Sequence, residues 1–75
     1  MDTTTSTRVL TFNRTKTGRL WATVNGRTGV VWDTPTGWVR WTVGGKPSGL
    51  ATSKAQAMGF VAELLGDFDG VAVAG

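Results

Sequence analysis

Residues 38–43, Trp-Val-Arg-Trp-Thr-Val, decide the fold because large apolar side chains alternate there with polar or more exposed positions. Successive side chains of a β-strand point to opposite faces of a sheet, so this order predicts a half-buried strand. The side chains expected to face the core are Val39, Trp41 and Val43. Those expected to face outward are Trp38, Arg40 and Thr42.

The same alternation occurs upstream, in residues 8–13 and 19–24, and residues 30–32 form a third short apolar stretch. Within 19–24 the expected inward side chains are Leu20, Ala22 and Val24. The expected outward side chains are Arg19, Trp21 and Thr23. Trp32 fits either face, because Val30 and Val31 compete for the inward position.

Turn signals separate these stretches at regular intervals. Asn25-Gly26 is the strongest, because both central residues of the favoured two-residue hairpin turn have positive φ. Polar segments 14–18 and 33–37 each end in Gly, and Pro35 fixes φ within the second. This spacing is typical of an antiparallel meander.

A helix signal follows the Gly-rich segment 44–49, which has the composition of a loop. Ser53 and Gln56 have the spacing of a capping box, in which each side chain accepts a hydrogen bond from the other's backbone N–H. Gly66 is expected at a left-handed C-terminal cap, and Gly59 at a close approach of helix and sheet. The residues expected on the apolar helix face are Ala57, Met58, Phe60, Val61, Leu64 and Leu65.

The sequence therefore predicts an α+β fold with an antiparallel three- or four-stranded meander sheet and one C-terminal α-helix packed on one face. Seventy-five residues leave room for one small domain, expected over residues 8–69. Residues 1–7 are expected to be a disordered lead-in. Residues 70–75 are expected to form a loose tail, with an added edge strand as the alternative.

Composition excludes many kinds of chemistry. Cys and His are absent, which excludes disulfides, imidazole bases and the usual zinc and haem sites. The five acids form no plausible pair with a nucleophile and a base, so we expect no enzyme, catalytic residue, metal or cofactor. No apolar run is long enough to cross a bilayer and residues 1–7 have no signal-peptide features, so we expect a cytoplasmic protein without a membrane partner.

The net charge of +3 is unevenly distributed. All eight Lys and Arg lie in residues 1–54 with two acids, which gives that part +6, and residues 55–75 carry three acids and no base. A basic segment of this kind favours a polyanionic partner such as nucleic acid.

Outward aromatic side chains interleaved with Arg indicate what that partner is. They suit base stacking, cation–π contact and phosphate pairing, and a twisted sheet can also enter a DNA major groove. The leading hypothesis is a small non-enzymatic module that binds nucleic acid through a Trp/Arg-rich sheet face. The candidate binding residues are Arg19, Trp21, Thr23, Arg27, Trp32, Trp38, Arg40, Thr42 and Lys46.

Three alternatives use the same residues. Trp and Arg are typical of hot spots in protein interfaces, so a host-protein-binding effector (inhibitor or modulator) is the second hypothesis. In a purely structural interpretation, the Trp rings cover the far side of a thin sheet and Arg stems lie over them. The chain could also form a homo-oligomer through an uncovered edge strand or the Trp face.

Residues 37–65 resemble the arm-type DNA-binding domain of phage tyrosine integrases, and small phage or bacterial strand-strand-strand-helix proteins of the same layout. Gly37-Trp38-Val39-Arg40 is similar to the Gly-x-Trp strand of that family, and Thr52-Ser53-Lys54-Ala55-Gln56-Ala57 is similar to the segment that opens its helix, with Gln56 where the motif has Glu.

That resemblance implies a bacteriophage or mobile-element protein in the host cytoplasm. It also implies that the sheet face away from the helix docks in a DNA major groove. The residues it points to are Trp38, Arg40 and Thr42, joined by Arg19, Trp21 and Thr23 if their strand shares the face.

Overall fold

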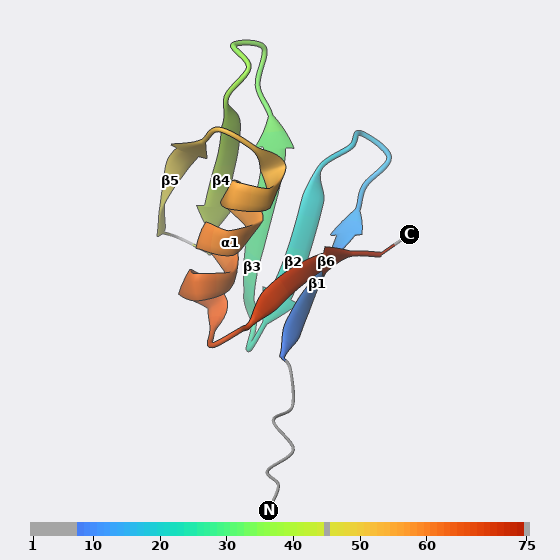
Figure 1. Cartoon of the computed structure of the whole chain (residues 1–75), viewed down its shortest axis with the longest axis vertical. Helices are drawn as coiled ribbons and strands as arrows, with labels where there is room; N and C mark the ends of the chain where they lie inside the picture. Colours follow the sequence, from blue (N-terminus) through green and yellow to red (C-terminus); the bar gives the residue numbers. More distant parts are fainter. Residues whose placement is uncertain (1–7, 45, 75) are drawn as a thin grey trace, which may run out of the picture.

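The structure is a computed structural model that describes residues 8–44 and 46–74; for residues 46–48 it describes the backbone only. Its described residues form six strands and one helix (Figure 1). The strands are β1 (Val9–Arg14), β2 (Leu20–Val24), β3 (Arg27–Asp33), β4 (Val39–Val43), β5 (Lys46–Ala51) and β6 (Gly70–Val73). The helix α1 spans Lys54–Leu65 and connects β5 to β6.

The strands form one mixed sheet in the order β5-β4-β3-β2-β1-β6. Strands β2 to β5 are an antiparallel meander, β1 is antiparallel to β2, and β6 is parallel to β1. The α+β class is therefore confirmed. The expected three or four purely antiparallel strands are wrong, because two segments without a clear strand pattern also join the sheet.

The first of these segments is β5, which has the composition of a loop. It pairs with β4 through Val39↔Ala51 and Trp41↔Gly49, with a register shift between Trp41 and Val43. A Cβ atom on Gly49 would lie 2.6 Å from Cζ2 of Trp41, so the large ring requires a glycine on the neighbouring strand. This glycine reflects close packing within a sheet, although its neighbours in sequence suggest a loop.

The second segment is β6, where the structure has the edge strand in place of a loose tail. Its residues pair in register with β1, from Val9↔Gly70 to Phe12↔Val73. Asp69 fixes the start of the pairing: its Oδ2 accepts a hydrogen bond from the Arg8 N–H at 2.8 Å, and its own N–H donates to the Arg8 carbonyl at 2.7 Å.

The helix covers one face of the sheet and contacts β3, β4, β5 and β6 (Figure 1). The inward positions expected for β2 and β4 are confirmed: Val39 and Val43 are buried, and the half-buried ring of Trp41 lies 5.7 Å from that of Phe60. Phe60 and Leu64 lie at the border of the helix face and are more than one-third exposed. The core consists of Leu10, Phe12, Leu20, Ala22, Val31, Val39, Val43, Ala51, Ala57, Met58, Val61, Ala62 and Leu65.

The helix ends differ in part from the expected caps. Ser53 Oγ accepts the Gln56 N–H at 3.1 Å as expected, but Gln56 Oε1 accepts from the Thr52 N–H, at 2.8 Å, and not from Ser53. The left-handed cap at Gly66 is wrong, because its φ of 171° is extended. A Cβ on Gly66 would lie 3.1 Å from the Phe68 ring, so glycine is favoured there by close packing.

The close approach of helix and sheet occurs at Gly29 and not at Gly59. A Cβ on Gly29, in the centre of β3, would collide with Cγ1 of the buried Val61. A Cβ on Gly59 would meet nothing within 4 Å. Gly29 therefore lets the helix rest directly on the third strand.

We expect Gly29→Ala to lower the free energy of unfolding by about 1–3 kcal/mol, because the added methyl group pushes Val61 and the helix away from the sheet. Gly59→Ala is the matched control, and it should leave stability unchanged or raise it by up to about 1 kcal/mol through helix propensity. Urea unfolding measures both. Equal effects of the two substitutions would contradict this packing.

Candidate functional site

The sheet face opposite α1 is the candidate site, and we call it the outer face. Directly paired residues on neighbouring strands share a face, so the register assigns its members. No other described element lies on this face. Its residues within the strands include Asn13 of β1, Trp21 and Thr23 of β2, Thr28, Val30 and Trp32 of β3, Arg40 and Thr42 of β4, and Leu50 of β5.

One row of the outer face is built around Trp32. Arg40 of β4 pairs directly with Trp32, and Leu50 of β5 pairs with Arg40. On the other side, Arg19 places its guanidinium carbon 4.6 Å from the centroid of the Trp32 ring. Trp32 therefore lies on the outer face, half-buried, while Val31 takes the inward position and is fully buried.

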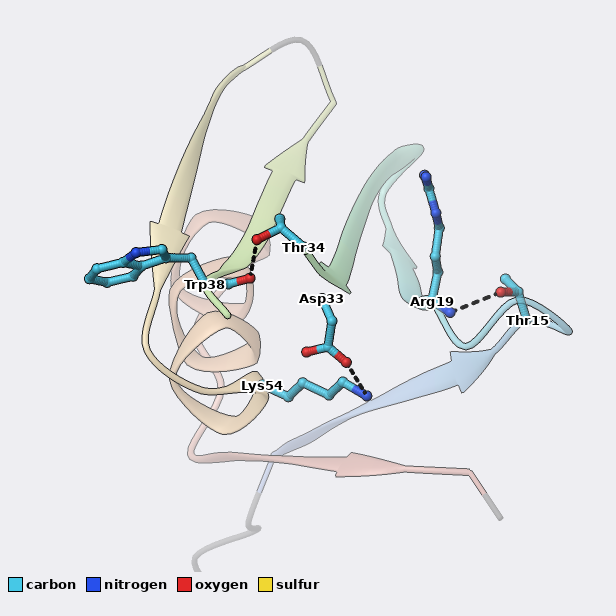
Figure 2. Close-up of polar contacts among 6 residues, drawn as sticks. All are labelled: Thr15, Arg19, Asp33, Thr34, Trp38 and Lys54. Carbon is cyan, nitrogen blue, oxygen red and sulfur yellow. Dashed lines mark hydrogen bonds and ion pairs between the residues drawn. The ribbon is translucent and has the colours of Figure 1, made fainter. Parts of the chain in front are cut away.

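Arg19 is held at the start of this row by the turn that precedes β2. Its N–H donates to the Thr15 hydroxyl at 3.0 Å, and the Thr15 N–H donates to the Arg19 carbonyl at 2.8 Å (Figure 2). Fixing the backbone of Arg19 directs its side chain over Trp32, because the two residues share one face of neighbouring strands.

The next row contains Trp21. It pairs with Asn13 on one side and with Val30 on the other, and Val30 pairs with Thr42. The Trp21 side chain is 37 % exposed. Beyond this row, the hydroxyls of Thr23 and Thr28 are 2.8 Å apart and bind each other across β2 and β3.

Two predicted site residues do not belong to the outer face as described. Arg27 lies on the helix side of the sheet, where its Nη2 donates to the Leu65 carbonyl at 3.4 Å. There its charge offsets the negative carboxyl end of α1. The side chain of Lys46 lies outside the described residues.

Trp38 is outward but separate from the other aromatic residues. It is 47 % exposed, and its carbonyl accepts hydrogen bonds from the Thr34 N–H and hydroxyl at the turn before β4. Its indole points away from Arg19 (Figure 2). Arg19, Trp21, Trp38 and Arg40 therefore do not form the single cluster that the alternation suggested, because β3 and Trp32 lie between β2 and β4.

Several basic residues are engaged elsewhere. Lys54 Nζ lies 3.1 Å from Asp33 Oδ2, an ion pair that joins the start of α1 to the end of β3 (Figure 2). The Arg8 guanidinium carbon lies 4.7 Å from the centre of the Phe68 ring. The positive charge of residues 1–54 is therefore distributed around the molecule. Among the described side chains, Arg19 and Arg40 are the basic ones placed on the outer face.

A pocket of about 510 Å³ that the sequence did not predict lies where the ends of β1 and β6 meet. It is lined by Asn13, Arg14, Val73 and Ala74. Asn13 pairs with the outward Trp21, whereas Arg14 and Val73 pair with the buried Leu20 and Phe12, so the lining comes from both faces of the sheet. Sequence reasoning missed it because half of its lining belongs to the segment expected to be loose.

Comparison of the chain with protein-family models, with curated proteins and with solved structures found no match. Among the described residues, no helix has the length and apolar character needed to cross a membrane. The same residues contain no group of three or more potential metal ligands. The outer face itself offers aromatic surfaces, hydroxyl and amide groups, and arginine side chains.

The two faces of β4 give a test of this assignment. Trp41→Ala should lower the free energy of unfolding by about 3 kcal/mol, because it removes the ring that packs between Gly49 and Phe60. Trp38→Ala should change it by less than about 1 kcal/mol, because that ring is half-exposed beyond the strand. Equal losses in urea unfolding would show that the inward and outward assignments are wrong.

Proposed function

We propose that this protein is a small non-enzymatic module that binds nucleic acid through its outer face. The observation that carries the proposal is the stack of Arg19 on Trp32, beside the exposed ring of Trp21, on the side of the sheet that the helix leaves open. Aromatic rings and guanidinium groups are the side chains on which bases stack, and arginine also pairs with phosphate.

The remaining groups of the outer face support the same function. Thr42 and the Thr23–Thr28 pair provide hydroxyls that can hydrogen-bond to phosphate or sugar oxygens. The net charge of +3 favours the approach of a polyanion at low ionic strength. A cytoplasmic location is part of the proposal.

The resemblance of residues 37–65 to the integrase arm domain also supports nucleic acid as the partner. In this chain, those residues contain antiparallel β4 and β5 followed by α1. A phage or mobile-element origin, and docking of the face in a major groove, remain predictions of that resemblance.

Fluorescence titration with labelled DNA at about 50 mM salt tests the proposal, and affinity should fall steeply as salt rises. Arg19→Ala should weaken binding about tenfold, because it removes both a charge and a stacking surface. Lys54→Ala removes the same charge at the Asp33 ion pair and should have little effect. Absence of binding, or equal losses in the two variants, would contradict the proposal.

One observation favours a protein partner as the second candidate function. Leu50 in β5 and Trp38, directly before β4, are 50 % and 47 % exposed, and large apolar side chains of this kind anchor protein interfaces. A host-protein-binding effector would retain its partner in a pull-down from nuclease-treated lysate and lose it on Leu50→Ser. A homo-oligomer through β5, β6 or the Trp side chains would appear in light scattering.

A further inference from the structure

We infer that the outer face binds single-stranded nucleic acid, with bases stacked on Trp21 and on the Arg19–Trp32 pair. It discriminates against duplexes, in place of the major-groove docking that the resemblance implies. This inference rests on the proposed function and specifies the class of ligand. It is carried by the spacing of two stacking surfaces, by their exposure, and by the amide of Asn13 beside Trp21.

The two stacking surfaces lie next to each other along β2. Arg19 and Trp21 are two residues apart and on the same side of the sheet, which separates their Cα atoms by about 6.6 Å. Trp32 lies diagonally across from Trp21, because Trp21 pairs with Val30 two residues earlier in β3. Side chains in diagonal positions lie within reach of a common extended ligand.

Both surfaces are open to a base. The Trp21 ring makes no ring or cation contact with any other described side chain and is 37 % exposed. The Trp32 ring is covered by the guanidinium of Arg19, so a base arriving there meets the guanidinium plane supported by the indole beneath it. Arginine planes stack unpaired bases in the same way as aromatic rings do.

A single strand can use these surfaces and an intact duplex cannot. In a duplex each base is already stacked between its neighbours, so only base edges and phosphates are accessible. An indole could then contact a base face only after unstacking, which costs free energy. A duplex would have to be bound mainly through its phosphates, which requires many basic side chains on the outer face. Arg27 and Lys54 do not contribute to that face, because they are engaged on the helix side.

Asn13 extends the path beyond Trp21. Asn13 lies beside Trp21 in register and lines the pocket together with Arg14. There the Asn13 amide, on the outer face beside Trp21, can pair with the edge of an unstacked base. The strand therefore crosses the sheet from β3 over β2 to the end of β1.

The experiment compares a fluorescein-labelled single-stranded oligothymidylate of about 12 nucleotides with a duplex of equal length at the same salt concentration. We expect the single strand to bind at least about tenfold more tightly. Trp21→Leu keeps an apolar side chain without an aromatic face and should weaken binding about tenfold, whereas Trp21→Phe should retain most of the affinity. Arg19→Lys keeps the charge but loses the planar group and should weaken binding several-fold.

The outcomes separate the inference from the proposed function. Duplex binding as tight as single-strand binding would overturn the inference and leave nucleic-acid binding intact. Equal affinities of the Trp21→Leu and Trp21→Phe variants would overturn stacking at Trp21. No binding to either probe would overturn both proposals, and thermal unfolding verifies that each variant is folded.

Discussion

The contact between Gly29 and Val61 determines how the rest of the structure is arranged. Because glycine stands at this position of β3, α1 lies directly on the centre of the sheet and buries the apolar side chains of one face. A single helix cannot cover the opposite face as well. Trp21, Trp32 and Arg19 therefore remain at the surface, where a thin sheet has no second layer to bury them.

The side chains of the inner face stabilise the domain by burial. Those of the outer face are not needed for the core and are available for binding. Trp41 illustrates the first role, because its ring is held by packing against Phe60 and above Gly49. Its Nε1 is buried without a hydrogen-bond partner among the described residues. Trp32 illustrates the second role, because it lies on the face opposite the helix and carries the Arg19 guanidinium on its ring.

The side-chain alternation of residues 19–24 and 38–43 was sufficient to predict which side chains face the core and which face outward. It could not place Trp32, because two adjacent valines both fit the inward position. Strand β5 was missed because a Gly-rich composition indicates a loop. The sequence does not show that Gly49 is needed to accommodate the ring of Trp41 on the neighbouring strand. Strand β6 was predicted only as the alternative to a loose tail, because its pairing with β1 joins residues about sixty positions apart, and the pocket at Asn13 was missed. The position of Arg27 on the helix side could not be predicted, because its partner, the Leu65 carbonyl at the end of α1, is 38 residues away in sequence.

The most direct test of this account follows the four tryptophan indole N–H signals by NMR while a single-stranded oligothymidylate is added. The signals of Trp21 and Trp32 should shift with increasing ligand, because their rings lie at the binding surface. The signal of Trp41 should remain in place, because its Nε1 is buried and its ring packs against Phe60 of the helix. A shift of the Trp41 signal with unchanged Trp21 and Trp32 signals would show that the ligand binds on the helix side, and it would contradict the account.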